Sequence, residues 1–279
     1  MNVLLSTSGS ARSGPYHYRI EEPARAVHEA DVGVQVTVQK GLVTTMRTPP
    51  GGGAPEVCDV DAQGADVVVL QLPKTVEMLQ CIRILQAQGV AVVVEMDDLL
   101  SAIPYGHPAH ETLVRKGKAR RALECAREAD FVTTSTPALL EEYGPRGSGA
   151  VVPNAIPRRT AELPPAYDRQ AGVVTVGWPG SVLGHPYDLQ EMGSGLQQAL
   201  DAAGDAGRFV ILGQKADARQ RLRLREEPAE IPWIPDVDGY TAAIGELFDV
   251  GVAPLRMDRF NTAKSWLKAL EFAARGVWF

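Results

Sequence analysis

The sequence is poor in cysteine, in positive charge and in long apolar runs. Its three cysteines, Cys58, Cys81 and Cys125, are widely spaced and odd in number, so neither a disulfide framework nor a structural zinc site is expected. A reducing, cytoplasmic compartment is therefore the expectation. No apolar run approaches the roughly 20 residues of a membrane-spanning helix, and Met1–Thr7 is too short and uncharged for a secretory signal peptide.

The charge balance argues against a general nucleic-acid-binding protein. The chain has 28 Lys and Arg residues against 34 Asp and Glu residues, and a formal net charge of −6, whereas such proteins are usually basic. A local basic pocket for a phosphorylated ligand is still compatible with this balance. The 45% hydrophobic content over 279 residues is normal for one large or two medium globular domains.

Apolar, β-branched segments alternate with helical segments along most of the chain, which predicts a doubly wound α/β fold. Buried parallel strands give uninterrupted apolar runs, as in Val67–Leu70 and Ala91–Val94. The expected strands are Asn2–Ser6, Val34–Val38, Asp66–Leu70, Val90–Glu95, Phe131–Thr134, Ala150–Val152, Val173–Val176, Phe209–Leu212, Ile231–Ile234 and Asp249–Ala253. The expected helices are Ile20–Ala30, Thr75–Gln88, Ala109–Ala129, Pro137–Tyr143, Asp188–Ala203, Asp217–Glu227, Tyr240–Leu247 and Thr262–Arg275.

A proline-rich stretch, Pro153–Pro165, interrupts this alternation and is the best linker candidate. We therefore predict an N-terminal Rossmann-like domain over residues 1–157, a linker over 158–170 and a C-terminal Rossmann-like domain over 171–279, facing one another across a cleft. The second domain has four clear strands, and its last helix is followed only by Gly276–Phe279. The sequence thus predicts a shortened, incomplete C-terminal domain.

The segment Phe260–Glu271 follows an apolar strand and is expected to begin a helix. Two cations near a helix N-terminus, with a carboxylate one to two turns later, suit a diphosphate followed by a ribose diol. A solvated helix face with ordinary ion pairs fits the same spacing. The residues expected on this face are Lys264, Lys268, Glu271 and Arg275.

Two Gly-rich loops are candidates for contact with a phosphate group. Ser8–Tyr16 follows the first strand, but it is not a GxGxxG motif, and Gln39 and Lys40 stand where a nicotinamide-binding domain has an acidic residue. Gly177–Ser181 follows the first strand of the second domain, with His185 just beyond. A plain structural turn is the alternative for each loop.

Polar residues also follow the most apolar strand of the first domain. Glu95, Asp97 and Asp98 can bind a divalent metal, orient a sugar hydroxyl or cap the next helix. His107 and His110 come next, in a loop that can serve a substrate or simply be exposed.

Taken together, these segments resemble a GT-B glycosyltransferase of the group 1, or family 4, type. The resemblance is clearest in DVGVAPL (249–255), FNTAKS (260–265) and LKALEFAARGV (267–277). Weaker similarity lies in Gly14–Arg19, Glu95–Asp98, Asp130–Thr136 and Val151–Asn154, so that the resemblance covers nearly the whole chain.

The resemblance implies a nucleoside-diphosphate-sugar donor held mainly by the C-terminal domain and an acceptor held by the N-terminal domain. Glu271 matches the second glutamate of the family's E-x7-E motif, which binds the ribose hydroxyls. No metal and no further cofactor are expected, because cationic side chains and helix dipoles stabilise the leaving diphosphate. The expected donor-binding residues are Gly180, Ser181, Asn261, Lys264, Ser265, Lys268 and Glu271; the expected catalytic residues are Lys264, Asp97 and His107; and the expected acceptor-side residues are Gly14, Tyr18, Arg19 and Asp98.

The chain departs from the family pattern in two places. Ala263 stands where the first glutamate of E-x7-E belongs, so Asn261 or Lys264 is expected to replace it. The family also continues beyond the position of Phe279, so a partner chain can be expected to complete the domain.

The sequence thus predicts a cytoplasmic, retaining transferase of the hexosyltransferase type. Its acceptor can be a glycan, a lipid, a protein or a small molecule, with no nucleic acid expected. A non-catalytic nucleotide-sugar-binding or assembly protein and a sugar-nucleotide epimerase of the same architecture are the alternatives.

Overall fold

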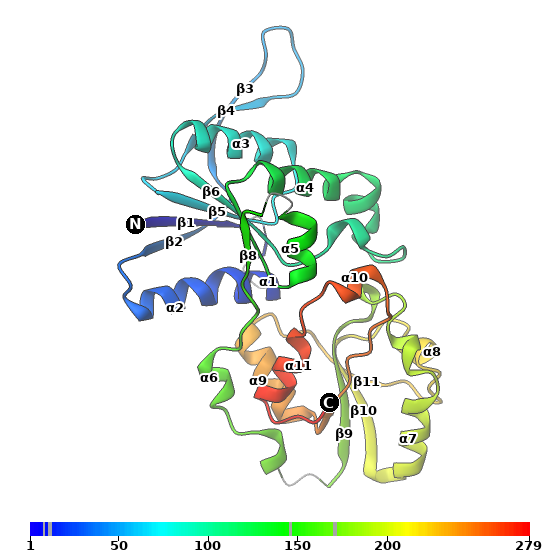
Figure 1. Cartoon of the computed structure of the whole chain (residues 1–279). Coiled ribbons are helices and arrows are strands. Elements are labelled where there is room, and N and C mark those ends of the chain that lie inside the picture. The colour runs from blue at the N-terminus through cyan, green and yellow to red at the C-terminus, as the bar shows by residue number, and fades with distance from the viewer. Residues whose placement is uncertain (8, 11–12, 145–146, 170–171) are drawn as a thin grey trace. The chain divides into compact units, whose positions relative to one another are not determined.

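The computed structural model describes residues 1–7, 9–10, 13–144, 147–169 and 172–279, which divide into two units (Figure 1). The first unit consists of Met1–Ile103, Glu111–Asn154 and Thr262–Ser265, and the second of Pro104–His110, Ala155–Asn261 and Trp266–Phe279. Two short segments, Pro104–His110 and Thr262–Ser265, therefore belong to a different unit from their neighbours in the sequence.

A parallel six-stranded sheet forms the centre of the first unit, in the order β2-β1-β5-β6-β7-β8. The strand order reverses direction between β1 and β5, and ligands bind beyond the carboxyl ends of strands at such a switch point. The strands are β1 (Asn2–Thr7), β2 (Gln35–Lys40), β5 (Val67–Gln71), β6 (Ala91–Met96), β7 (Phe131–Thr134) and β8 (Gly149–Val151).

Helices cover both faces of this sheet, with α2 on one side and α3 and α4 on the other (Figure 1). Thr75 and Thr136 start their helices by accepting a hydrogen bond from a backbone N–H three residues later. The helices are α1 (Gly14–Tyr16), a π-helical turn (His17–Glu21), α2 (Glu22–Ala30), α3 (Val76–Ala87), a 3-10 helix (Leu100–Ala102), a second π-helical turn (Glu111–Arg115), α4 (Lys118–Glu128) and α5 (Pro137–Tyr143).

An antiparallel hairpin lies between β2 and β5, where a crossover helix is usual. It consists of β3 (Val43–Arg47) and β4 (Glu56–Asp61), and α3 packs on β4 through the buried Val57 and Val60. This hairpin was not predicted, because all of β3 is exposed and it has no apolar face to produce a recognisable alternation.

A four-stranded parallel sheet forms the centre of the second unit, in the order β11-β10-β9-β12. Alternate residues of β10 enter two different hydrophobic clusters: Val210 and Leu212 pack with Phe248 and Phe272, whereas Phe209 and Ile211 belong to the other cluster. Since successive strand residues point to opposite faces, this sheet is covered on both sides. The strands are β9 (Val174–Ser181), β10 (Gly207–Gln214), β11 (Ala229–Ile231) and β12 (Val250–Gly251).

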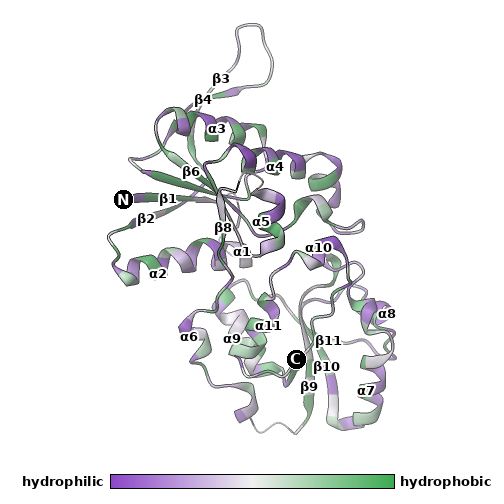
Figure 2. Ribbon diagram, viewed as in Figure 1, coloured by the Kyte–Doolittle hydropathy of each residue, from purple (hydrophilic) through white to green (hydrophobic). Residues whose placement is uncertain are grey.

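The longer helices of this unit are α7, α9 and α11. Its helices are α6 (Arg158–Ala161), α7 (Gly195–Ala203), α8 (Ala218–Arg221), α9 (Val237–Leu247), α10 (Arg259–Thr262) and α11 (Leu267–Ala274), with 3-10 turns at Ala166–Asp168, Val182–Gly184, Leu189–Met192 and Gly204–Ala206. Apolar residues are concentrated on the strands of both sheets (Figure 2). Both units are thus α/β with parallel sheets, which confirms the predicted fold class.

Several predicted elements are wrong in their bounds. The predicted helix Thr262–Arg275 begins only at Leu267, because α10 ends at Thr262 and the chain between α10 and α11 is not helical. The predicted helices Ala109–Ala129 and Asp188–Ala203 are each interrupted at a glycine of positive φ, Gly117 and Gly193, which favours a break in the helix. The predicted helix Asp217–Glu227 shrinks to the single turn of α8.

The predicted loop Gly177–Ser181 is instead the end of strand β9. Within the described ranges, no helix has both the length and the apolar character needed to span a bilayer.

Candidate functional site

The carboxyl ends of β9 and β10 meet at a pair of glycines. Gly180 and Gly213 are neighbours in the strand register, with φ of +143° and +135°. A Cβ on Gly213 would lie 2.1 Å from the carbonyl oxygen of Gly180, a distance that no side chain can occupy. Glycine is therefore required here, and the two strand ends form a surface without side chains.

Lys268 lies beside this glycine pair. Its Nζ donates a hydrogen bond to the carbonyl oxygen of Pro179 at 2.5 Å, and it is 3.5 Å from the position of a Cβ on Gly180. Lys268 is in the first turn of α11, so the helix holds its ammonium group at the end of β9. The structure therefore brings the predicted residues Gly180 and Lys268 together.

A pocket of about 590 Å³ opens at the same edge of the sheet. Trp233 is 49% exposed and its ring lies 5.4 Å from that of Tyr240. Ser181 donates a hydrogen bond to Gln214 at 2.7 Å. A half-exposed indole beside polar side chains suits a flat, polar ring. The pocket is lined by Ser181, Gly213, Gln214, Glu230, Pro232 and Trp233.

Trp233 is a residue that the sequence analysis missed. The predicted strand Ile231–Ile234 is wrong, because β11 ends at Ile231. Pro232 and Pro235 flank Trp233 and Ile234, and two prolines so close together argue against a strand interior. An exposed aromatic residue between prolines just after a strand was the available signal.

Glu271 and Arg275 do not share an open face with Lys268. Glu271 is buried, and burial together with the Glu271 charge raises the pKa of Tyr240 well above its ordinary value. Arg275 is 2% exposed and donates to the carbonyl oxygens of Thr241, Thr160, Leu163 and Pro164 at 3.0–3.4 Å. The predicted four-residue face is therefore wrong: Arg275 ties the segment 160–164 to α9 and α11.

Asn261 lies in a buried cluster around Asp188. Its Nδ2 donates to Asp188 at 2.7 Å and to the carbonyl oxygen of Arg256 at 3.1 Å, while Asp188 also accepts from Nδ1 of His185 at 2.7 Å. Burial alone would raise the pKa of Asp188, but the bonds from His185, Asn261 and the backbone N–H of Arg256 outweigh it and lower that pKa. Asn261 thus fixes the chain that leads into α10.

His107 belongs to the second unit. Its Nδ1 accepts a hydrogen bond from the backbone N–H of Ala109 at 3.0 Å, and its ring meets that of Phe260 edge-on at 6.3 Å. Nε2 lies 3.9 Å from the position of a Cβ on Gly184. Since Nδ1 is an acceptor here, the neutral ring carries its proton on Nε2.

A row of polar side chains crosses the six-stranded sheet near its carboxyl edge. Thr7, Gln71, Glu95 and Thr133 are successive partners in the register of β1, β5, β6 and β7. Thr7 donates to Gln71 at 2.6 Å, and Gln71 donates to the carbonyl oxygen of Pro15 at 2.8 Å. The row therefore holds the turn around Gly14, whose preceding loop residues Ser8, Ala11 and Arg12 lie outside the described residues.

Arg19 is bound to the same row. It is 7% exposed, and it donates to Glu95 at 2.7 Å, to the carbonyl oxygen of Val152 at 2.6 Å and to Asn154 at 3.1 Å. Tyr18 is likewise buried. Both residues, predicted to contact an acceptor, are thus packed into the unit.

The carboxylates of Glu95, Asp97 and Asp98 form one acidic cluster. Burial raises the pKa of Glu95 to about 7 although Arg19 opposes the shift. Burial and the charges of Glu95 and Asp98 raise the pKa of Asp97 well above its usual range. Burial also raises the pKa of Asp98, against the positive charge of Lys264. Oε2 of Glu95 and Oδ1 of Asp97 have no hydrogen-bond partner among the described residues.

Neither aspartate caps the following 3-10 helix, whose N-terminal residue Leu99 makes no side-chain cap. The helix-cap alternative for Asp97 and Asp98 is therefore wrong.

The segment Thr262–Ser265 is bound to the first unit. Thr136 donates to the carbonyl oxygen of Ala263 at 2.7 Å, and Asn154 donates to Oγ of Ser265 at 2.7 Å. The sequence analysis placed Lys264 and Ser265 at a helix start beside Lys268. They instead precede α11. The positive charge of Lys264 acts on Asp98, where it opposes the rise in pKa caused by burial.

No protein-family model matches the chain, and no curated protein matches it by sequence. Solved structures match its fold. Anabaena HepE in complex with UDP gives a TM-score of 0.52 at 17% identity, over 93% of this chain and 76% of that chain. The lipopolysaccharide outer core galactosyltransferase WaaB gives 0.56 at 10% identity, over 99% and 79%. An α-glucosyltransferase in complex with UDP and a 13-mer DNA containing a HMU base gives 0.57 at 12% identity, over 99% and 78%.

The chain has the fold of GT-B glycosyltransferases. Two of these three proteins are glycosyltransferases, and two were solved with UDP. The resemblance predicted from the sequence is thus confirmed at the level of the fold.

Proposed function

We propose that the chain transfers a sugar from a nucleoside-diphosphate sugar to a hydroxyl acceptor. The observation that supports this best is the carboxyl edge of the second sheet. There, the Gly180–Gly213 pair, the Lys268 ammonium and the Trp233 pocket lie together. A surface without side chains next to a cation suits a diphosphate, and an indole beside polar groups suits a nucleobase.

The donor is held by both charge and shape in this proposal. Lys268 neutralises the diphosphate, Ser181 borders the base pocket, and Glu271 serves the ribose from the next turn of α11. Asn261 acts indirectly, because its hydrogen bonds to Asp188 and to the carbonyl oxygen of Arg256 fix the chain that leads into α10. Lys264 and Ser265 are further proposed donor-binding residues, and the charge of Lys264 is proposed to stabilise the leaving diphosphate.

The acceptor is assigned to the first unit. The unsatisfied oxygens of Glu95 and Asp97 accept hydrogen bonds from acceptor hydroxyls, since a buried polar atom without a partner is costly unless a ligand satisfies it. The charge of Asp98 raises the pKa of Asp97 in this cluster. The turn around Gly14 is assigned to the same acceptor side. His107 of the second unit is proposed as a catalytic residue, because its neutral ring carries a proton on Nε2. The proposed transfer proceeds with retention. It uses no metal ion, because lysine charges neutralise the leaving diphosphate in its place.

The test is a titration with UDP, GDP and ADP, followed by their glucose conjugates, by isothermal calorimetry. Lys268→Ala is expected to weaken binding of the preferred diphosphate by about tenfold or more, equivalent to about 1.4 kcal/mol. Lys116→Ala, which removes an exposed lysine of the first unit, is the matched control. Equal affinity in the two variants would overturn the donor assignment.

A non-catalytic nucleotide-sugar-binding protein is the second candidate. Ala263, which is buried, stands where the resembled family has a carboxylate. Binding without transfer or hydrolysis over a panel of glycan, lipid, protein and small-molecule acceptors would favour this candidate. Release of a free epimer would instead identify an epimerase.

A further inference from the structure

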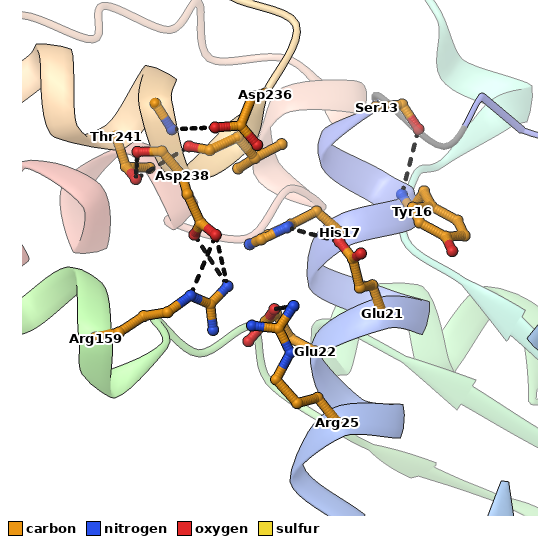
Figure 3. A network of polar contacts seen from close by, with 12 residues as sticks. Ser13, Tyr16, His17, Glu21, Glu22, Arg25, Arg159, Asp236, Asp238 and Thr241 are labelled. Atoms are coloured by element: carbon orange, nitrogen blue, oxygen red, sulfur yellow. Dashed lines mark hydrogen bonds and ion pairs between the residues drawn. The ribbon is translucent and has the colours of Figure 1, made fainter.

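Three side chains with metal-ligating atoms converge where the π-helical turn His17–Glu21 meets α2 (Figure 3). One ligand atom from each of His17, Glu21 and Glu22 lies within 4.8 Å of the others. Nδ1 of His17 is 3.2 Å from Oε2 of Glu21. The proposed sugar transfer assigns no role to these residues, so the cluster stands independently of that proposal.

The backbone of the turn explains why these three residues meet. In an α-helix each residue advances by about 100°, so residue i+5 points about 140° away from residue i. A π-helical turn is closed by a bond from residue i+5 to residue i, which brings both i+4 and i+5 beside residue i. The N–H of Glu22 makes this bond to the carbonyl oxygen of His17. The π-helical turn therefore places both glutamates next to one imidazole.

The ligand atoms are held in place by their surroundings. His17 is 4% exposed, and its ring meets Tyr18 edge-on at 4.9 Å. The turn is fixed at its start by Ser13, which accepts a hydrogen bond from the N–H of Tyr16 at 3.3 Å, and within it by the Arg19–Glu95 pair. The side chains of Glu21 and Glu22 are 40% and 14% exposed, so an ion can enter from solvent. A rigid, open set of ligands favours metal binding.

We propose that His17, Glu21 and Glu22 bind a divalent transition-metal ion, best suited to Zn²⁺. One imidazole nitrogen and two carboxylate oxygens belong to the ligand types of Zn²⁺ sites that keep an open position for water. Mg²⁺ and Ca²⁺ prefer oxygen ligands alone and bind less tightly here. The ion cross-links the π-helical turn to α2 and competes with Arg25, which is 3.5 Å from Glu22. This departs from the sequence expectation of a protein without a metal site.

The experiment measures Zn²⁺ binding by calorimetry and Zn²⁺-dependent thermal stability in a Cys58→Ser background, because the exposed Cys58 thiol is itself a zinc ligand. One Zn²⁺ per chain is expected. Glu22→Gln removes one ligand but keeps the His17–Glu21 hydrogen bond, so the fold is retained while the affinity falls by about tenfold or more. His17→Ala is expected to remove binding.

His28→Ala and Glu29→Gln are the matched controls, since both residues are exposed on the same helix α2 and contribute no ligand. Unchanged Zn²⁺ affinity in the controls, together with the loss in Glu22→Gln, supports the site. Equal affinity in Glu22→Gln and the controls identifies an adventitious ion only and overturns the proposal, as does the absence of binding at a tenfold excess of Zn²⁺.

Discussion

The two sheets have the same parallel architecture but opposite chemistry at their carboxyl edges. The first sheet ends in buried carboxylates, of which Glu95 accepts a hydrogen bond from Arg19 of the π-helical turn. The second sheet ends in two glycines, and Lys268 of α11 lies beside them. An edge filled by side chains is suited to orienting hydroxyl groups, whereas an edge without them leaves room for a bulky, charged ligand. This difference is the basis for assigning the acceptor to the first unit and the donor to the second in the proposed transfer.

The largest effect is expected from Arg19→Ala. This change leaves Glu95 buried without its cation, which costs about 3–5 kcal/mol of unfolding free energy. Urea denaturation at pH 8 measures the loss. The cost should shrink at pH 5, where Glu95 is protonated because its pKa is about 7, and in the double variant Arg19→Ala/Glu95→Gln. An equal loss at both pH values would contradict this account of the edge.

Two buried carboxylates, one in each unit, should also respond oppositely to pH. Glu95 has its pKa raised from 4.5 to about 7, so its contribution is fully present below pH 4.5 and is lost as pH rises to about 7, by about 3 kcal/mol. Asp188 has a lowered pKa, so its contribution is lost as pH falls below 3.8. Stability measured from pH 3 to 8 should therefore decline less between pH 4.5 and 7 in Glu95→Gln and fall less on the acid side in Asp188→Asn.

Gly213→Ala tests the requirement for an edge without side chains. The new Cβ would meet the Gly180 carbonyl oxygen at 2.1 Å, at a φ of +135°, so we expect a loss of about 2–3 kcal/mol and weaker nucleotide binding. Gly195→Ala is the control, because Gly195 is exposed in the same unit and no atom lies within 4 Å of its added Cβ. Thermal unfolding and nucleotide titration measure both effects; wild-type behaviour of Gly213→Ala would refute the requirement.

The smallest effects are expected at the N-caps of helices, a feature that is found in each of the two units. Thr75 caps α3 in the first unit and Asp236 caps α9 in the second. Replacing either with alanine should cost about 1 kcal/mol of unfolding free energy. Similar losses in chemical denaturation would show that the units differ in their sheet edges rather than in how their helices begin. A threefold difference between the two variants would contradict that view.

Much of the fold was predictable, because buried parallel strands leave continuous apolar runs. The β5 and β6 runs and the Thr75 and Thr136 helix starts follow from local physics alone. The β3–β4 hairpin was not predictable, since its exposed strand has no apolar period. The break before α11 was also missed, because Ala263, Lys264 and Ser265 are all compatible with a helix, and bonds from Thr136 and Asn154 hold the segment elsewhere.

The candidate site was predicted only in part, because contacts between residues far apart in the sequence also decide where its side chains lie. Gly180 and Lys268 meet as expected, because Lys268 lies on a helix that follows β12, the neighbour of β9 in the sheet. Arg275 matched the helical spacing of Lys268 but is bound to four backbone carbonyl oxygens. Spacing gives the direction of a side chain on its helix, whereas the neighbours decide whether that direction leads to solvent or to the core.

The α/β class, the alternation of strands and helices, and the roles expected for Gly180 and Lys268 follow from the amino-acid sequence, because these depend on apolar runs and local conformational preference. Packing in three dimensions makes Arg19 and Glu95 buried partners and places Trp233 beside a pocket. Those outcomes depend on contacts between residues far apart in the chain, where burial changes the strength of charges and hydrogen bonds.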